Sequence, residues 1–259
     1  MEKTLNTKIL SQVDCVLNDY ESLTDTAIRI VKVAREYGIT LRLMGGLAVA
    51  IHCHGLHAQH LRAYHDVDFF GLSKESKTIR LVLEKFGYSP DIMLNAIRGT
   101  TRMKFDKVSE TVEVFLDKFI MEHVLDFRTR VHLDSLTIPL TDLFLTKIQN
   151  VKLAKKDLTD IVALLADHDI GRGEAKELLE IDYIAKLCSD DWGLWKSVTD
   201  NLSKVAREIE EDVLIVEKPD ILNKITRIRE AIDSAEKTFR WKLRAHVGEK
   251  VQWYYTVEE

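Results

Sequence analysis

The sequence predicts an α/β N-terminal domain followed by a helical C-terminal domain. In the first 140 residues, short apolar runs of the kind typical of strands alternate with segments of helical periodicity. From residue 141 onward helical periodicity dominates, and the whole chain holds only 3 prolines, which favours long helices and few loops. We therefore place an α/β domain at residues 1–140 and a helical domain at residues 141–259.

The N-terminal domain is expected to begin with a helix, a strand and a second helix. Residues 22–38 carry the apolar face of a helix, and Gly38 suits the position just past its end. Residues 39–44 alternate apolar and polar side chains as a half-buried strand does. Two glycines follow, and residues 47–54 then form a short apolar run that predicts a helix.

Five further elements complete the predicted N-terminal domain. Residues 67–72 form an apolar strand, and a helix starts at Ser73 and ends at Gly87. Two strand-like runs separated by five residues indicate a hairpin or meander, and a last strand is closed by a proline. These runs are residues 100–105, 111–117 and 131–138, the last followed by Pro139.

The C-terminal domain is predicted to contain five helices and a short final strand. Pro219 suits the first position of one of these helices. The tail is rich in aromatic and β-branched residues, which favour a strand. The predicted helices cover residues 142–151, 156–168, 174–188, 192–211 and 219–237, and the strand covers residues 247–257.

The composition is that of an ordinary globular protein and excludes several classes. The 259 residues are 46% hydrophobic and 31% charged, and the net charge of −5 argues against a chain that binds nucleic acid over its whole surface. Three scattered cysteines fit a reducing compartment. No apolar run approaches the ~20 residues of a membrane helix, and the N-terminus lacks a signal-peptide core. We therefore expect a cytoplasmic protein with no membrane partner.

A glycine pair and two carboxylates are the most informative pattern in the chain. Gly45 and Gly46 join a predicted strand to a predicted helix, where the backbone can approach a phosphate at the helix N-terminus. Asp66 and Asp68 share one face of the next strand, with Val67 turned into the core. Carboxylates that share a face repel each other unless a cation lies between them, and Mg²⁺ prefers carboxylates together with substrate phosphates.

A later strand offers a third carboxylate for the same metal site. Glu113 and Asp117 share a face of the run 111–117. If this strand lies beside the one that carries Asp66 and Asp68, three carboxylates could hold two metal ions about 3.5–4 Å apart. The alternative is that Asp68 is solvated and Glu113 is an ordinary outward strand residue.

Basic residues near these carboxylates are candidates for phosphate binding. Arginine can clamp a phosphate with two hydrogen bonds, and lysine acts as a point charge. The alternative for Arg102 is a solvated strand face, and Lys156 with Asp160 is interpreted as a pair that only supports a helix. The candidates are Arg62, Arg102, Lys104 and Lys147.

Histidines and aromatic residues form two further groups without a clear role. The histidine spacing matches no recognised zinc arrangement, and we interpret the group as polar residues on an exposed helix end and loop. The aromatic residues near the C-terminus could stack bases, but we interpret them as core or interface anchors. The histidines are His52, His54, His57, His60 and His65, and the aromatic residues are Trp241, Trp253, Tyr254 and Tyr255.

Three motifs together resemble the nucleotidyltransferase superfamily that includes DNA polymerase β. They are Met-Gly-Gly at 44–46, His-Asp-Val-Asp-Phe at 65–69 and Val-Glu-Val-Phe-Leu-Asp at 112–117. Within the superfamily the chain resembles the minimal and AbiEii-like bacterial members over about residues 20–170. The resemblance implies a nucleotidyltransferase fold, in which a small mixed sheet with flanking helices precedes a helical domain.

The resemblance also implies roles for individual residues. Gly45 and Gly46 would hold the phosphates of a nucleoside triphosphate, while Asp66 and Asp68 would bind Mg²⁺ or Mn²⁺. The third carboxylate falls on Glu113, where the family usually has aspartate, and Asp117 could contribute instead. Residue 47 is leucine where active relatives often carry serine, which removes one hydroxyl from the phosphate site.

The function expected from this pattern is the Mg²⁺-dependent transfer of a nucleoside monophosphate from a triphosphate to an acceptor hydroxyl. Pyrophosphate would be released, and the acceptor is a small molecule, an RNA or a protein. Three alternatives stay open. They are an AbiEii-like toxin that modifies RNA and is neutralised by an antitoxin partner, a catalytically silent nucleotide-binding protein, and an interaction protein whose α/β half is only a scaffold.

Overall fold

The N-terminal half of the chain is built on a five-stranded mixed sheet. The computed structural model describes residues 23–53, 66–173, 177–211 and 218–256. The strand order is β1-β2-β5-β4-β3, in which β2 and β5 are parallel and the other neighbours are antiparallel. The strands are β1 (Leu41–Met44), β2 (Asp66–Gly71), β3 (Ser89–Pro90), β4 (Arg102–Lys107) and β5 (Glu110–Leu116).

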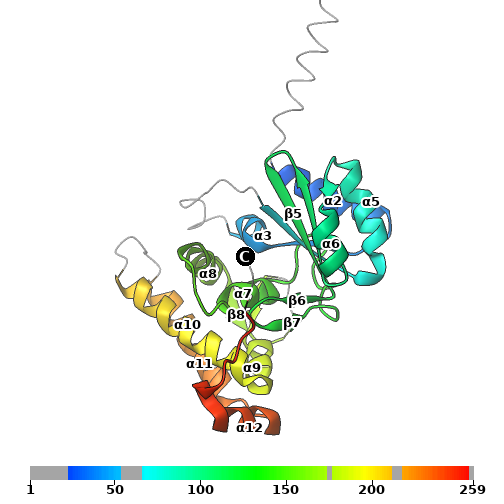
Figure 1. Cartoon of the computed structure of the whole chain (residues 1–259). Coiled ribbons are helices and arrows are strands. Elements are labelled where there is room, and N and C mark those ends of the chain that lie inside the picture. Colours follow the sequence, from blue (N-terminus) through cyan, green and yellow to red (C-terminus); the bar gives the residue numbers. More distant parts are fainter. Residues whose placement is uncertain (1–22, 54–65, 174–176, 212–217, 257–259) are drawn as a thin grey trace, which may run out of the picture.

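Helices flank this sheet (Figure 1). The apolar faces of α2 and α5 are buried, and these two helices pack against each other. The helix α3 follows β1 without a loop and packs against the first helices of the C-terminal half. The flanking elements are α2 (Leu23–Glu36), α3 (Gly45–His52), the 3₁₀ turn η1 (Ser73–Glu75), α5 (Ser76–Lys85) and α6 (Ile92–Arg98).

The C-terminal half consists mainly of helices. All nine residues of α7 are buried, and α10 and α11 pack against each other and against α9 (Figure 1). No helix in the described ranges is both long enough and apolar enough to cross a membrane. The helices are α7 (Leu140–Ile148), α8 (Lys155–Asp167), α9 (Ile181–Asp190), α10 (Trp192–Glu211), α11 (Lys218–Ser234), α12 (Phe239–Val247) and the 3₁₀ turn η2 (Gly248–Lys250).

Two small strand pairs complete the fold. The antiparallel pair is β6 (Lys118–Ile120) with β7 (Val124–Asp126), and the parallel pair is β8 (Asp169–Gly171) with β9 (Leu178–Glu180). Among the described residues, a continuous apolar core runs from Ala27 in α2 to Ile232 in α11. The predicted fold class is therefore confirmed, because a small mixed sheet with flanking helices precedes a largely helical half.

The register of the central strands places three charged residues side by side. Asp68 in β2 lies opposite Glu113 in β5, and Lys104 in β4 lies opposite Glu113 from the other side. Val67 is 1% exposed. Because side chains alternate along a strand, the two aspartates that flank Val67 share the other face of the sheet, as predicted.

The predicted strand at residues 131–138 is wrong. This segment makes only an isolated bridge, in which the N–H of Leu43 donates to Leu136 and the N–H of Ile138 donates to Leu43. The side chain of Asp134 accepts hydrogen bonds from the N–H groups of Leu136 (2.7 Å) and Thr137 (3.2 Å). An aspartate that binds the backbone two and three residues ahead favours a turn over a strand ladder.

Two further boundaries differ from the prediction. The segment expected as a helix from residue 174 contains β9, so its helix starts only at Ile181, and residues 174–176 lie outside the described ranges. The tail predicted as a strand at 247–257 contains η2 and then irregular chain up to the last described residue. Gly248, at φ +58°, ends α12, and a hydrogen bond from the N–H of Tyr255 to the Glu122 carbonyl (2.9 Å) holds the tail.

A buried ion-pair network ties the loop after β7 to the C-terminal half. Arg130 donates from Nε to Asp142 (2.9 Å) and from Nη2 to Glu180 (2.6 Å). Its guanidinium also lies 3.9 Å from the centre of the Tyr183 ring. The side chains of Arg130, Asp142 and Glu180 are 8%, 0% and 7% exposed, so neither carboxylate has an alternative partner in solvent.

We predict that Arg130→Ala destabilises the protein by about 3–5 kcal/mol, because it leaves two buried carboxylates without their cation. The measurement is urea denaturation followed by circular dichroism. Arg128→Ala is the matched control, since Arg128 pairs with Asp126 on the surface and should change the free energy of unfolding little. Equal effects of the two substitutions would contradict the structural role of the network.

Candidate functional site

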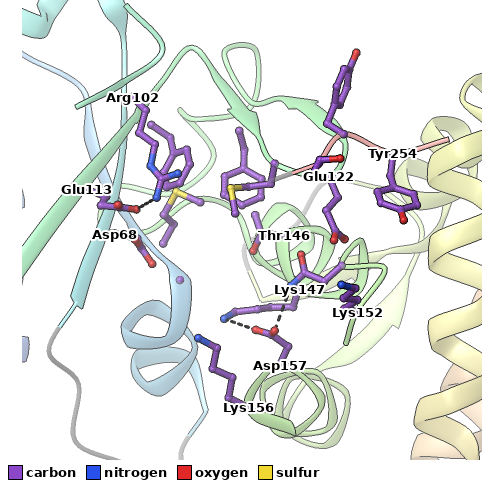
Figure 2. A pocket seen from close by; sticks show the side chains of 18 residues that line it. Asp68, Arg102, Glu113, Glu122, Thr146, Lys147, Lys152, Lys156, Asp157 and Tyr254 are labelled. Atoms are coloured by element: carbon purple, nitrogen blue, oxygen red, sulfur yellow. Dashed lines mark hydrogen bonds and ion pairs between the residues drawn. The ribbon is translucent and has the colours of Figure 1, made fainter. Parts of the chain in front are cut away.

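A polar cavity of about 500 Å³ lies between the sheet and the helices of the C-terminal half. Figure 2 shows Asp68, Glu113 and Arg102 on the sheet side, with Lys147, Lys156 and Asp157 across the cavity. Residues from β6, from the following turn and from the C-terminal tail complete the wall. Both halves of the chain are therefore needed to form this cavity.

The backbone of Gly45 packs closely against the side chain of Asp68. Gly45 has φ +71°, which glycine adopts readily and other residues rarely do. A Cβ at this position would lie 3.0 Å from the Asp68 Cγ and would overlap its Oδ2. The carboxylate of Asp68 thus occupies the space that a side chain at residue 45 would take. Gly46 lies in the same first turn but does not line the cavity.

Asp68 and Glu113 form an acidic pair on neighbouring parallel strands. Burial and, to a smaller extent, the charge of Glu113 together raise the pKa of Asp68 to about 6, although the cations of Lys147 and Arg102 partly oppose the shift. Within the part of the chain that the structure describes, the Asp68 carboxylate accepts no hydrogen bond. Asp66 is exposed at the start of β2, on the same face as Asp68. Asp68 is thus short of positive charge, whereas Glu113 is paired with Arg102.

Arg102 is held at the sheet side of the cavity by two contacts. Its guanidinium makes an ion pair with Glu113 and lies 4.9 Å from the centre of the Phe115 ring. Lys104 lies on the other side of Glu113 and lines a neighbouring cavity of about 600 Å³ instead. The structure therefore brings Arg102 to the site and leaves Lys104 next to it.

Lys147 presents a buried ammonium group to the cavity. Its Nζ lies 3.2 Å from Asp157 and 2.8 Å from Asp160, both on α8, and its side chain is 10% exposed. Burial lowers the pKa of Lys147, but the two carboxylates outweigh burial and the net shift is upward. The group is therefore held in its charged form opposite Asp68.

Two further lysines line the same wall. Lys152 follows α7 and Lys156 lies in the first turn of α8, and both are exposed. Among the described residues, neither makes an ion pair with a carboxylate. The interpretation of Lys156 as a helix-supporting partner of Asp160 is wrong, because Asp160 pairs with Lys147 and Lys156 faces the cavity (Figure 2).

Asp117 is not brought to the acidic pair. Its carboxylate accepts hydrogen bonds from the N–H (3.0 Å) and the hydroxyl (2.6 Å) of Ser73 at the start of η1. It lies one residue beyond the end of β5 and has φ +63°, so the alternation that placed it on the same face as Glu113 is broken. Arg62 lies outside the described residues. Leu47 is 2% exposed and packs in the core.

Sequence reasoning missed the contribution of the C-terminal tail. Tyr254, Tyr255 and Thr256 line the cavity together with Glu122, which follows β6. The aromatic residues of the tail were the sequence feature that could have indicated this contribution. Two of them, Tyr254 and Tyr255, line the cavity, and Trp253 anchors the tail. The Trp253 ring packs edge-on against the Trp192 ring, with the ring centres 6.2 Å apart. This contact holds the residues that follow Trp253 at the cavity.

Comparisons with known proteins identify distant structural similarity. No family model and no curated protein matches the chain. The lincomycin-bound lincosamide antibiotic adenylyltransferase LnuA is 15% identical with a TM-score of 0.38, over 52% of this chain and 92% of that one. An antigenic nucleotidyltransferase-like protein from Paracoccidioides brasiliensis is 12% identical with a TM-score of 0.42, over 83% of this chain and 94% of that one.

We predict that Gly45→Ala disrupts the acidic pair and destabilises the protein by more than about 1 kcal/mol, because the new Cβ overlaps the Asp68 carboxylate. Gly38→Ala is the matched control, since Gly38 has φ +70° and no atom within 4 Å of a Cβ. Both substitutions strain a backbone with positive φ, so the additional loss of melting temperature in Gly45→Ala measures the clash with Asp68. Equal losses would show that the Asp68 side chain lies elsewhere.

We predict that Asp68→Asn stabilises the protein near pH 7 and has little effect near pH 4. A pKa raised from 3.8 to about 6 means that the folded state binds more protons than the unfolded state between these values. The Asp68 carboxyl therefore lowers stability as pH rises through this window, and the substitution should recover about 1–3 kcal/mol. Urea denaturation from pH 4 to 8 measures the effect. The exposed Asp66→Asn serves as the control and should show no such pH-dependent gain.

Proposed function

We propose that this chain is a Mg²⁺-dependent nucleotidyltransferase. It transfers a nucleoside monophosphate from a nucleoside triphosphate to an acceptor hydroxyl and releases pyrophosphate. The observation that carries the proposal is the Asp68 carboxylate, which lies beside Glu113 and against the Gly45 backbone without a hydrogen bond from the described residues. Lysines face this acidic pair from the opposite wall of the cavity (Figure 2).

The acidic pair fits a divalent metal ion. The pKa of Asp68 is raised first by burial and then by the charge of the neighbouring Glu113, and a cation stabilises a carboxylate in such a place. All the available donors are carboxylate oxygens, which Mg²⁺ and Mn²⁺ prefer. Asp68 and Glu113 would hold the metal, and the exposed Asp66 would contribute from the start of β2. When bound, the ion would neutralise charge on the reacting phosphate and make the acceptor hydroxyl more acidic.

The cationic residues of the cavity suit a triphosphate. Lys147, Lys152 and Lys156 line the wall formed by α7, the following loop and α8. The first turn of α3 adds main-chain N–H groups at Gly45, where the helix dipole favours an anion. A cavity of about 500 Å³ lies within the range of small-molecule sites. Glu122 and the tail tyrosines remain as partners for the nucleoside.

An adjoining cavity offers room for the acceptor. It measures about 350 Å³ and shares Arg102, Phe115 and Tyr255 with the first cavity. In the proposed reaction the acceptor oxygen forms a bond to the α-phosphorus as the bond to the bridging oxygen of pyrophosphate breaks. Glu113 would orient the acceptor hydroxyl and accept its proton. The rate gain would come from positioning and charge stabilisation.

Calorimetric titration with non-hydrolysable ATP, GTP, CTP and UTP analogues tests the site. We predict that one analogue binds in a Mg²⁺-dependent manner and that Asp68→Asn abolishes the metal dependence. We further predict that Lys147→Met weakens binding at least about tenfold, because it removes a desolvated cation from the phosphate wall. Asp200→Asn changes a half-exposed aspartate on α10 that pairs with Lys196, and it should leave binding unchanged.

Turnover measured with labelled triphosphates decides between the proposal and its alternatives. Transfer of label to a small molecule or a protein supports the general reaction, with a loss of about 10³-fold in Asp68→Asn. Label in RNA would favour an AbiEii-like activity, for which an antitoxin partner could be sought. Mg²⁺-dependent binding without turnover would indicate a catalytically silent protein. No binding of any analogue would contradict the proposal.

A further inference from the structure

A second group of metal-ligating side chains lies outside the cavity. His52 ends α3, His168 directly follows α8, and Glu177 directly precedes β9. The Glu177 Oε2 atom lies 3.5 Å from His52 Nδ1 and 3.7 Å from His168 Nδ1. One ligand atom from each of the three residues lies within 4.8 Å of the other two. Residues that are 116 and 125 positions apart from His52 are thus brought to a single point.

We propose that His52, His168 and Glu177 bind a zinc ion that fastens the end of α3 to the C-terminal half. Two imidazoles and one carboxylate are a donor set that zinc accepts, with water in the fourth position. Mg²⁺ and Ca²⁺ prefer sites made of oxygen atoms alone. This site is separate from the acidic pair, and the inference does not depend on the proposed reaction.

The distances require only small adjustments to admit the ion. Zinc bonds of about 2.0–2.2 Å in a tetrahedral arrangement place neighbouring ligand atoms about 3.3 Å apart. The measured 3.5 and 3.7 Å separations from Glu177 are close to this value. Small rotations of the two imidazoles and of the Glu177 side chain, which is 58% exposed, would bring the three atoms to bonding distance.

The remaining ring nitrogens are oriented as they are in known metal sites. Metal-binding histidines generally hydrogen bond through their second nitrogen, which fixes the tautomer and the direction of the ring. Here His52 Nε2 lies 2.8 Å from the hydroxyl of Thr137, and His168 Nε2 lies 4.0 Å from the Sγ of Cys53. The Nδ1 atoms of both rings lie toward Glu177. Cys53 contacts the far side of the His168 ring and is not counted as a ligand.

Burial distinguishes the two imidazoles from the carboxylate. The side chains of His52 and His168 are 6% and 7% exposed, which contradicts the interpretation of His52 as an exposed polar residue. An ion would therefore be enclosed by protein on the imidazole side and reached by water on the Glu177 side. The other four histidines of the sequence cluster lie outside the described residues.

The proposed role is structural. The N-terminus of α3 carries Gly45, which packs against Asp68, and its C-terminus carries His52. An ion at His52 would fix the far end of this eight-residue helix to α8 and β9. Because the three ligands converge only in the folded chain, binding should stabilise the native state by linkage.

Titration of the chelator-treated, full-length protein with Zn²⁺ and Co²⁺ tests the proposal. We predict that one equivalent of Zn²⁺ binds and raises Tm by about 5 °C or more at a hundredfold excess over Kd. Co²⁺ should give the strong visible absorption of a four-coordinate site. His52→Gln and Glu177→Gln should each weaken Zn²⁺ binding at least about tenfold, and the exposed Glu177 is a position whose substitution should not prevent folding.

Two controls make the result specific. His132→Gln changes an exposed histidine and should leave Zn²⁺ binding unchanged. Asp68→Asn removes a carboxylate from the acidic pair and should also leave Zn²⁺ binding unchanged. Zinc binding of equal strength in the parent, His52→Gln and Glu177→Gln proteins would overturn the proposal, as would a folded parent protein that binds no Zn²⁺. Loss of binding in Asp68→Asn alone would assign the zinc to the acidic pair instead.

Discussion

The absence of a side chain at residue 45 is the constraint on which the candidate site depends. The Asp68 carboxylate fills the volume that a Cβ of residue 45 would occupy. Met44 pairs with Asp68 in the antiparallel ladder of β1 and β2, which places the next residue, Gly45, beside Asp68. The same position starts α3, whose first turn therefore lies directly against a carboxylate. A larger residue would push Asp68 away from Glu113 and separate the acidic pair from the helix N-terminus.

Charge at the cavity is divided between the two halves of the chain. The sheet supplies two close carboxylates, and burial raises the pKa of one of them. The helical half supplies lysines, and the most buried of these, Lys147, is kept charged by Asp157 and Asp160. Arg102 belongs to the sheet and already neutralises Glu113. Among the residues that the structure describes, the charges of the cavity that lack an ion-pair partner therefore include Asp68 on one wall and Lys152 and Lys156 on the other.

Local sequence patterns predicted the sheet side of the site well. A two-residue period placed Asp66 and Asp68 on one face. The glycine pair marked the junction of strand and helix, although α3 starts at Gly45, two residues earlier than predicted. What failed were features set by long-range packing or by a single backbone angle. The Asp134 side chain binds the backbone of a turn where a strand was predicted. The left-handed conformation of Asp117 directs its carboxylate toward Ser73 and away from Glu113. His168, Glu177 and the tail tyrosines join their neighbours only through the tertiary fold, which spacing alone does not reveal.

The unbroken core across residue 140 limits how this chain could have been assembled. Each half contributes one wall of the cavity, and α3 packs against both α7 and α8. Recombination that replaced the helical half would remove three lysines and expose the apolar surface of α3 at the same time. The two halves are thus structurally interdependent, and a change in what the cavity can bind would have to come from substitutions in its walls.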